Sequence, residues 1–322
     1  MTVDPVGAPA GPATAAVTAV VVTYEPDADV VGLLLGALVP QVAAVVVVDN
    51  GSAPERVAAL RDACAAHPGV RLVPLPDNRG IAAAQNVGIR DAAAHGATHV
   101  LLSDQDSLPA PDMVHRLLDG LAVAQRRGPV GAVGPVTVDE RNGTAALLFA
   151  ARTWGPRRAD LPEGDGRLVD VAFLIASGCL VPMTVLDAVG PMNEDWFIDH
   201  IDLEWGLRAR RAGFALYGVT GASLAHQLGD RTQRIPGRER AVHIHSPRRN
   251  YYMVRNTLLL VRGDLMSLRW RVGYVAWITK YAVFYALVPP PRAERIRVMA
   301  RAVRDALAGR AGPWASGGSA RR

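Results

Sequence analysis

The first hundred residues alternate short apolar runs with longer segments in which apolar residues recur at helical spacing. The short runs are rich in β-branched and small residues and predict strands at 17–23, 45–48, 70–74 and 98–102. The longer segments predict helices at 29–38, 53–67 and 80–95. Strands that alternate with helices form βαβ units, so the pattern predicts an α/β fold with a mostly parallel, Rossmann-like sheet and flanking helices.

Beyond residue 105 the pattern becomes less regular. It predicts helices at 110–127, 185–189 and 202–212, and strands at 130–138, 169–175, 178–181, 215–219 and 222–226. Residues 139–169 are rich in Gly, Pro and Arg, and we expect an irregular, mobile loop there, close to the functional site. From about residue 248 the chain is basic and helical, which predicts a C-terminal helical extension.

These patterns divide the chain into four parts. Residues 1–16 lack the basic start and apolar core of a signal peptide, so we expect a disordered leader and a cytoplasmic location. Residues 17–247 form the α/β domain, 248–310 the helical region and 311–322 a disordered tail.

Composition narrows the choice of compartment and partner only slightly. Cys64 and Cys179 are too few for a disulfide framework and lack metal-ligand spacing, which favours a reducing compartment. The net charge is +5, and Arg is concentrated after residue 231, as in proteins that bind nucleic acid or an anionic membrane surface. The first half is near charge balance and carries the acidic motifs, so we expect no nucleic-acid partner.

Polar clusters follow three of the predicted strands. They are Thr23-Tyr24-Glu25, Asp49-Asn50-Gly51-Ser52 and Ser103-Asp104-Gln105-Asp106. In open parallel sheets, ligands bind beyond the carboxyl ends of the strands. The sequence therefore predicts that these acidic residues gather at one edge of one sheet.

Asp104 and Asp106 stand directly after the strand at 98–102. A divalent ion placed between a carboxylate and a nucleoside diphosphate would reverse their repulsion, and oxygen ligands suit Mg²⁺ or Mn²⁺. One Asp would bind the metal, and the other would contact ribose or water. The alternative is a solvated turn, since Asp and Ser favour turns.

Two further segments have both a functional and a structural interpretation. Asp49 is placed to accept hydrogen bonds from a nucleobase, with Thr23 and Tyr24 beside it; the alternative is an Asn-Gly turn with a helix N-cap at Ser52. The small residues of 78–86 would let a ligand approach closely, or would serve ordinary tight helix packing.

The chain resembles family 2 glycosyltransferases of the GT-A fold in four motifs taken in order: Thr23-Tyr24, Asp49-Asn50-Gly51-Ser52, Asn78-Arg79-Gly80 with Asn86, and Asp104-Gln105-Asp106-Ser107. The last motif and the segment from Phe197 to Trp205 are similar to the rhamnosyltransferase branch of that family. The motifs run from about residue 17 to 256, and as an ordered set they are specific.

The resemblance implies a metal-dependent site for a nucleotide sugar. It places the metal on Asp106 and on a late histidine, His226, and it leaves room for the donor sugar at Gly178. The donor-binding residues that it implies are Thr23, Tyr24, Glu25, Asp49, Asn78, Arg79, Gly80, Asn86, Asp104, Gln105 and Gly178.

Inverting transfer needs a base on the acceptor hydroxyl, and the resemblance places this base at Asp199. Asp202 would support Asp199, or cap the helix that starts there. Ile198 stands where the family often has Glu, so Asp202 stays open as the base. Trp196 and Phe197 would stack on an acceptor sugar or belong to the core.

The basic segment after residue 240 carries a second group of candidates. Arg248, Tyr252 and Arg255 lie near one helix face and predict a clamp over a diphosphate or a solvated basic face. His243 and His245 precede them and would serve the diphosphate or a lipid.

Residues 272–288 are apolar and aromatic, with Lys280 in the middle and Arg on both sides. A central Lys costs about 2.5–3.5 kcal/mol in a spanning helix, so the pattern favours a helix that lies in the membrane interface. The alternatives are a helix packed on the α/β domain and a dimer contact, which leaves a homo-oligomer open.

Together these features predict an inverting transferase that moves L-rhamnose from dTDP-rhamnose to a saccharide or lipid-linked saccharide acceptor. We expect it to act in cell-envelope polysaccharide synthesis, at the inner face of the membrane. A sugar nucleotidyltransferase would show an early Gly-rich basic loop, where this chain has Thr-Tyr-Glu-Pro. A non-catalytic sugar- or polyprenyl-binding scaffold predicts a broken acidic set, but Asp49, Asp104, Asp106 and Asp199 are all present.

Overall fold

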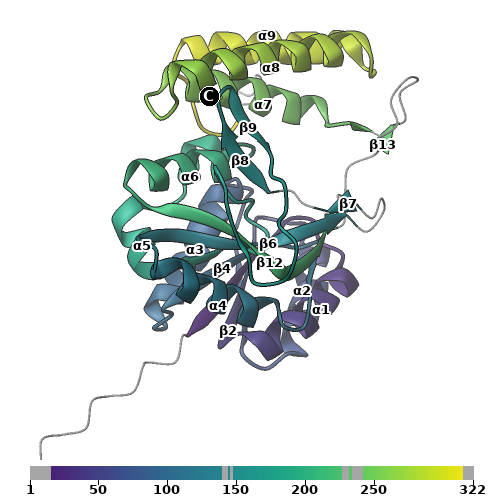
Figure 1. Cartoon of the computed structure of the whole chain (residues 1–322). Coiled ribbons are helices and arrows are strands. Elements are labelled where there is room, and N and C mark those ends of the chain that lie inside the picture. Colours follow the sequence, from purple (N-terminus) through teal and green to yellow (C-terminus); the bar gives the residue numbers. More distant parts are fainter. Residues whose placement is uncertain (1–15, 140–143, 146–147, 227–231, 234–241, 315–322) are drawn as a thin grey trace, which may run out of the picture.

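The computed structural model describes residues 16–139, 144–145, 148–226, 232–233 and 242–314. A ten-stranded sheet forms the centre of this part of the chain (Figure 1). Its strands are β1 (Val17–Thr23), β2 (Ala44–Asp49), β3 (Val70–Pro74), β4 (His99–Asp104), β5 (Ser107–Pro109), β6 (Val130–Asp139), β7 (Thr144–Ala145), β10 (Leu168–Asp170), β11 (Leu180–Pro182) and β12 (Ala215–His226). The main path runs β10-β12-β6-β11-β4-β1-β2-β3, with β5 paired to β12 and β7 to β6.

The strands predicted in the first hundred residues pair as expected. β1 lies between β2 and β4 and is parallel to both, and β3 is parallel to β2. Thr23 is opposite Asp49, and Val22 is opposite Asp104. Because the strands are parallel and in register, the three polar clusters meet at one edge of the sheet, as the sequence predicts.

Helices cover both faces of the sheet. α1 (Ala28–Leu38), α2 (Pro54–Ala65) and α4 (Met113–Gln125) share a hydrophobic core with one face. α3 (Ile81–Ala94), α5 (Met183–Val189) and α6 (Ile201–Arg211) share a core with the opposite face. Side chains alternate between the faces of a strand, so Val20 joins one core and Val21 the other. The predicted α/β class is confirmed.

Although 159–167 contain no helix or strand, the described residues of 139–169 are more regular than predicted. They contain an antiparallel hairpin of β8 (Phe149–Arg152) and β9 (Gly155–Arg158). Of the strand predicted at 169–175, only the start pairs in the sheet, as part of β10.

The two strands predicted at 215–219 and 222–226 are one strand, β12. Its pairing with β6 shifts register between Val219 and Ser223. Gly221 lies in this irregularity with a φ of +84°, a backbone conformation that glycine adopts readily. The glycine that separates two strands in the sequence pattern therefore bends a single strand.

Three helices, α7 (Pro247–Arg262), α8 (Leu268–Leu287) and α9 (Arg292–Leu307), form a separate layer in the described carboxyl-terminal part (Figure 1). They have an apolar cluster of their own, which Phe197 of the α/β domain joins. None of the helices in the described ranges has both the length and the hydropathy needed to cross a bilayer.

The packed chain continues beyond the end predicted for the helical region. The Trp314 backbone N–H donates to Tyr252 Oη at 2.7 Å, and the Trp314 ring lies against Tyr251. Residues 311–314 thus pack on α7. The rest of the predicted tail, and the leader except for its last residue, lie outside the described residues.

Candidate functional site

Asp49 fixes the edge of the sheet where β1 and β2 end. It is fully buried, and its Oδ2 accepts from Thr23 Oγ1 at 3.1 Å and from Ser52 Oγ at 2.6 Å. Its Oδ1 accepts the Ser52 backbone N–H at 2.9 Å. Gly51 has a φ of +81°, and a Cβ there would come within 2.3 Å of the Asp77 backbone. Asp49 thus holds a tight turn, and the N-cap of α2 is Ala53, not Ser52.

A cavity of about 200 Å³, open to solvent, lies at this edge. The predicted donor-binding residues that line it are Thr23, Tyr24, Asn78, Gly80, Asp104 and Gln105. The Tyr24 backbone N–H donates to Gln105 Oε1 at 2.8 Å, which ties the end of β1 to the turn after β4. The structure therefore brings together most of the predicted donor set around one cavity.

The start of α3 is locked against the segment that precedes α6. Gly80 has a φ of +90°, and a Cβ on it would lie 2.7 Å from Phe197 Cα. The Ile81 backbone N–H donates to the Phe197 carbonyl at 2.7 Å. Asn78 Oδ1 accepts from the Gly80 N–H at 3.1 Å and holds the bend. Only glycine fits this approach, which brings the donor cavity and the segment before α6 into contact.

Three other predicted donor residues have different surroundings. Glu25 Oε1 accepts the Ala53 N–H at 2.8 Å. Asn86 is buried and exchanges two hydrogen bonds with the backbone of Met192, at 2.8 and 2.9 Å. This arrangement favours the packing interpretation for Asn86. The exposed Arg79 guanidinium makes no hydrogen bond or ion pair with any described residue, so it is free to reach a ligand.

Ser177 connects Asp104 to the next motif. Its hydroxyl donates to Asp104 Oδ2 at 2.7 Å and lies 2.8 Å from Ser107 Oγ. Gly178 follows with a φ of +81°, and a Cβ there would meet the Pro135 ring at 2.5 Å. Gly178 is therefore required by the close packing of its own loop, whatever room it also leaves for a sugar.

The predicted metal ligands lie close together along the backbone. Asp106 occupies the turn between β4 and β5, and His226 is opposite Ser107 in the pairing of β12 with β5. The side chain of His226 lies outside the described residues, and the described residues contain no group of three metal-binding side chains. Carboxylate and imidazole groups are ligands that suit Mg²⁺ or Mn²⁺, so the residue types of the predicted set fit such an ion.

Asp202 lies on the first turn of α6 and lines a second, larger cavity. Its Oδ2 accepts the Ala176 N–H at 3.1 Å, so it does not cap its own helix. Burial, and then the nearby Asp104 carboxylate, raise the pKa of Asp202 to about 7. Asp202 and His200 both line the larger cavity. A carboxyl group with such a pKa can accept a proton near neutral pH.

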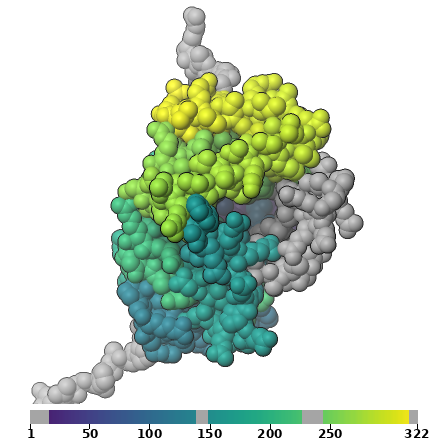
Figure 2. Space-filling view, turned by 45° about the horizontal axis from the view of Figure 1, so that its top comes forward, coloured from purple at the N-terminus to yellow at the C-terminus, as the bar shows by residue number. Residues whose placement is uncertain are grey.

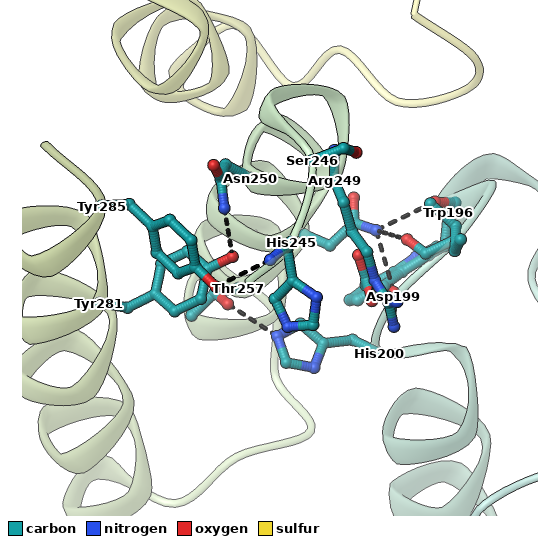
Figure 3. Close-up of polar contacts among 12 residues, drawn as sticks. Trp196, Asp199, His200, His245, Ser246, Arg249, Asn250, Thr257, Tyr281 and Tyr285 are labelled. Carbon is teal, nitrogen blue, oxygen red and sulfur yellow. Dashed lines mark hydrogen bonds and ion pairs between the residues drawn. The ribbon is translucent and has the colours of Figure 1, made fainter. Parts of the chain in front are cut away.

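Asp199, the base implied by the resemblance, faces α7 instead (Figure 3). Its side chain is only 4% exposed, and its Oδ1 accepts from Arg249 Nε at 3.0 Å. Its Oδ2 is buried with no hydrogen-bond partner among the described residues. Asp199 is a wall residue of neither cavity.

Side chains from α7 hold the backbone around Asp199. Phe197, Asp199 and His200 all have positive φ values, between 61° and 65°, which is unfavourable for residues with a Cβ. Asn256 Nδ2 donates to three carbonyls of this segment, those of Trp196, Ile198 and Asp199, at 2.8–3.0 Å. These bonds compensate for the strain, so α7 fixes the entry to α6.

His200 is a neutral imidazole of one tautomer. Burial lowers its pKa to about 4. Its Nε2 lies 2.7 Å from Thr257 Oγ1, and that hydroxyl already donates its proton to the Met253 carbonyl. Nε2 must therefore carry the proton, which leaves Nδ1 as the acceptor of the ring.

Three residues predicted to contact ligands take part in packing, and one of them, Phe197, also lines the donor cavity. Trp196 and Phe197 are both buried, and Phe197 stacks on Tyr252 with ring centroids 4.9 Å apart. Arg255, predicted as part of a diphosphate clamp, is 1% exposed and donates to the carbonyls of Asp195 and Trp196. The predicted clamp is wrong for Arg255, because its guanidinium binds backbone of the same chain.

Comparison with known proteins gives the family. The model of the family Glycosyl transferase family 2 matches residues 18–190, more than half of the chain. The chain belongs to glycosyl transferase family 2. This family 2 glycosyltransferase is 33% identical over 256 residues to the dTDP-rhamnosyl transferase RfbF of Shigella flexneri, covering 78% of the chain and 83% of the relative. The predicted likeness to the rhamnosyltransferase branch is confirmed.

Solved structures show the same fold. A mannosyltransferase from Pyrobaculum calidifontis, in complex with GDP-Man and Mn²⁺, superposes with a TM-score of 0.53 at 20% identity, covering 91% of this chain and 75% of that one. Residues 1–349 of S. aureus TarS, in complex with UDP-GlcNAc, give 0.56 at 13% identity, covering 90% and 81%. The predicted GT-A fold of this glycosyltransferase is confirmed.

Sequence reasoning missed several residues that shape the site. Ser177, Arg249, Asn256 and Thr257 had no assigned role, and His200 was only a spacer between two aspartates. Ser177 stands next to Gly178 in a motif that was recognised, so its polarity was an available signal. The α7 residues act on a segment about 55 residues earlier in the chain, and no local pattern shows such a pairing.

Proposed function

We propose that this glycosyltransferase moves L-rhamnose from dTDP-rhamnose to a hydroxyl group of a saccharide acceptor, with inversion at the anomeric carbon. The donor cavity at the strand ends, with Asp202 in the wall of the larger cavity, carries the proposal. The likeness to the dTDP-rhamnosyl transferase RfbF supports dTDP-rhamnose as donor. The acceptor belongs to cell-envelope polysaccharide synthesis in this proposal.

The donor would lie in the cavity at the strand ends. Thr23 and Tyr24 would line the base, the backbone around Gly80 would approach the diphosphate, and Gln105 would stay bound to the Tyr24 backbone. Asp106 and His226 would hold Mg²⁺ or Mn²⁺, with Asp104 beside them. The ion would supply positive charge that stabilises the leaving dTDP.

Asp202, rather than Asp199, is the base in this proposal. Asp202 lines the larger cavity, where an acceptor could enter, whereas Asp199 is paired with Arg249 and lines neither cavity. Asp202 would take the proton of the acceptor hydroxyl. The hydroxyl oxygen would then form a bond to the anomeric carbon, and the bond from that carbon to dTDP would break with its electron pair on the diphosphate.

The α/β domain and the helical region would have different roles. Residues 17–247 would bind the donor and carry Asp202, and 248–310 would hold the segment before α6 through Asn256. The helical region would also contact the inner face of the membrane. An exposed apolar face on α8 supports this membrane contact. It is formed by Leu268, Val272, Val275, Val283 and Leu287.

A thermal-shift screen tests the donor assignment. dTDP-rhamnose with Mn²⁺ should raise the melting temperature more than UDP-GlcNAc or GDP-mannose does at the same concentration, and EDTA should remove the effect. Equal shifts with all three donors would argue against dTDP-rhamnose. A shift that EDTA leaves unchanged would argue against the metal.

A further inference from the structure

A short loop at residues 176–178 connects two carboxylates that line different cavities. The Ala176 backbone N–H donates to Asp202 Oδ2 at 3.1 Å, and the Ser177 hydroxyl donates to Asp104 Oδ2 at 2.7 Å. Asp104 lines the donor cavity, and Asp202 lines the larger cavity. Figure 2 shows the hollow of the larger cavity between the yellow-green helices and the teal segment that contains β8 and β9. Two consecutive residues thus hold one carboxylate of each cavity.

The hydrogen bonds of the Ser177 hydroxyl have only one consistent direction. A hydroxyl group has one proton to donate and can accept twice, whereas a carboxylate oxygen only accepts, so the Ser177 proton goes to Asp104 Oδ2. The Asp104 backbone N–H donates to Ser177 Oγ at 3.3 Å. The Ser107 hydroxyl, 2.8 Å away, must then donate to the same oxygen. All three positions of this fully buried hydroxyl are occupied, so its orientation is fixed.

The bond to Ser177 leaves one oxygen of Asp104 for a ligand. Oδ2 accepts from Ser177, whereas Oδ1 has no hydrogen-bond partner among the described residues. Rotation of the carboxyl group about its Cβ–Cγ bond would break the bond to Ser177. Ser177 therefore determines which oxygen Asp104 can offer to a donor in the cavity that Asp104 lines.

Backbone contacts attach the loop to the strand that carries Asp104. The Gly178 N–H donates to the Leu102 carbonyl at 2.8 Å, and the Leu102 N–H donates to the Cys179 carbonyl at 2.9 Å. Leu102 lies on β4, and Asp104 is the last residue of that strand. A shift of the loop would therefore disturb the strand end as well as the two hydrogen-bonded carboxylates.

We propose that Ser177 is a positioning residue for the transfer reaction. Together with the Ala176 N–H, it fixes the Asp104 carboxylate of the donor cavity relative to Asp202, the base of the proposed function. This role rests on the proposed function, because it needs Asp202 to receive the proton of the acceptor hydroxyl. Ser177 lines neither cavity, so it acts through the two carboxylates. A misplacement of about 1 Å between reacting groups can slow an enzyme about 10²-fold, so such positioning affects the rate strongly.

Steady-state kinetics of Ser177→Ala tests this role. The assay follows release of dTDP from dTDP-rhamnose with Mn²⁺ and a cell-envelope glycolipid extract, at a temperature at which each variant is folded. Ser177→Ala removes the proton donor to Asp104, so kcat should fall about tenfold or more. KM for dTDP-rhamnose should change less than about threefold, because the residues that line the donor cavity are unchanged.

Two further variants separate positioning from folding. Ser177→Cys keeps a weak donor at the same place, so its kcat should lie between those of Ser177→Ala and the wild type. Thr220→Val is the matched control for loss of a buried hydroxyl. The Thr220 hydroxyl donates to the Gly164 carbonyl at 2.7 Å and accepts from the Arg167 N–H at 2.8 Å. Thr220 lines neither cavity, so Thr220→Val should lower the melting temperature and leave kcat unchanged.

The same assay separates this role from the proposed function. A wild type that transfers the sugar, with Ser177→Ala at the same kcat, keeps the proposed function and loses the positioning role. An equal loss of kcat in Ser177→Ala and Thr220→Val would also overturn the role, since stability alone would then explain it. If Ser177→Ala does not fold, a wild-type kcat in Ser177→Cys overturns it. A wild type that releases no dTDP from dTDP-rhamnose overturns the proposed function, and the role with it.

Discussion

At the scale of single residues, burial changes the chemistry that a side chain can perform. Asp202 and Asp199 are three residues apart and have the same carboxyl group, but their surroundings differ. Asp202 is buried near Asp104, which disfavours its charged form, whereas an Arg249 guanidinium neutralises Asp199. Their positions in the sequence do not show which of the two is the base, whereas their contacts in the structure favour Asp202.

The raised pKa of Asp202 predicts an unusual dependence of stability on pH. The folded carboxyl has a pKa of about 7, whereas an unfolded one has about 3.9. The folded protein therefore holds an extra proton between these values, and its stability from this group falls as the pH rises from about 4 to 7. Asp202→Asn should melt close to the wild type at pH 4 and at a higher temperature at pH 8. A difference in melting temperature that does not change with pH would contradict the raised pKa.

Gly178 offers a second test at this scale. Its φ of +81° and the Pro135 ring at 2.5 Å from an added Cβ predict that Gly178→Ala destabilises the fold by about 1–3 kcal/mol. Gly32→Ala in α1 is the matched control, because nothing lies within 4 Å of the added Cβ. That change should stabilise the protein by about 0.5–1 kcal/mol. Urea denaturation measures both, and a Gly178→Ala variant as stable as Gly32→Ala would show that the loop relaxes.

At the scale of elements, α7 supports the segment that leads into α6. Asn256 and Arg255 donate to backbone carbonyls between Asp195 and Asp199, and Thr257 accepts from His200. The helical region is therefore a structural part of the site, and truncation at its start would remove these bonds.

Asn256→Ala tests this support. One buried and two partly buried carbonyl hydrogen bonds would lose the same donor, so we expect a loss of about 1–3 kcal/mol in the free energy of unfolding. Transfer should slow, because the entry to α6 carries Asp202, while the thermal shift with donor should persist. Arg248→Ala is the control, since Arg248 is exposed and only lies over the Phe197 ring at 5.6 Å. Equal stability of the two variants would show that Asn256 is dispensable.

At the scale of the whole molecule, α8 has an exposed apolar face that adjoins its cavity-lining residues, and Val272 belongs to both. Val275 and Val283 lie on the exposed face, and Arg269 stands near its start. A surface of this kind can bind anionic lipid through apolar burial and charge.

Flotation with vesicles of phosphatidylglycerol and phosphatidylcholine tests this contact. The wild type should float with the vesicles, and Val275→Glu with Val283→Glu should reduce the bound fraction severalfold, because two new charges would have to enter the interface. Val30→Glu changes an exposed valine of α1 and should leave binding unchanged. Equal flotation of both variants would place the contact elsewhere on the protein.

The sequence predicts the α/β half of this molecule well because strands and helices there follow local periods. Thr23, Asp49 and Asp104 meet at one edge because parallel strands align their ends. The β8–β9 hairpin was missed, since its strands are short and are stabilised by α8. The roles of Asp202 and Arg255 depend on contacts between distant segments, which the sequence pattern does not contain.

The most direct test of the account compares Asp202→Asn with Asp199→Asn in release of dTDP from dTDP-rhamnose. The assay uses Mn²⁺ and a cell-envelope glycolipid extract as acceptor. We predict that Asp202→Asn keeps the donor-induced thermal shift and loses transfer by about 10²-fold or more, whereas Asp199→Asn keeps a larger share of the rate. Transfer that persists in Asp202→Asn and disappears in Asp199→Asn would contradict it.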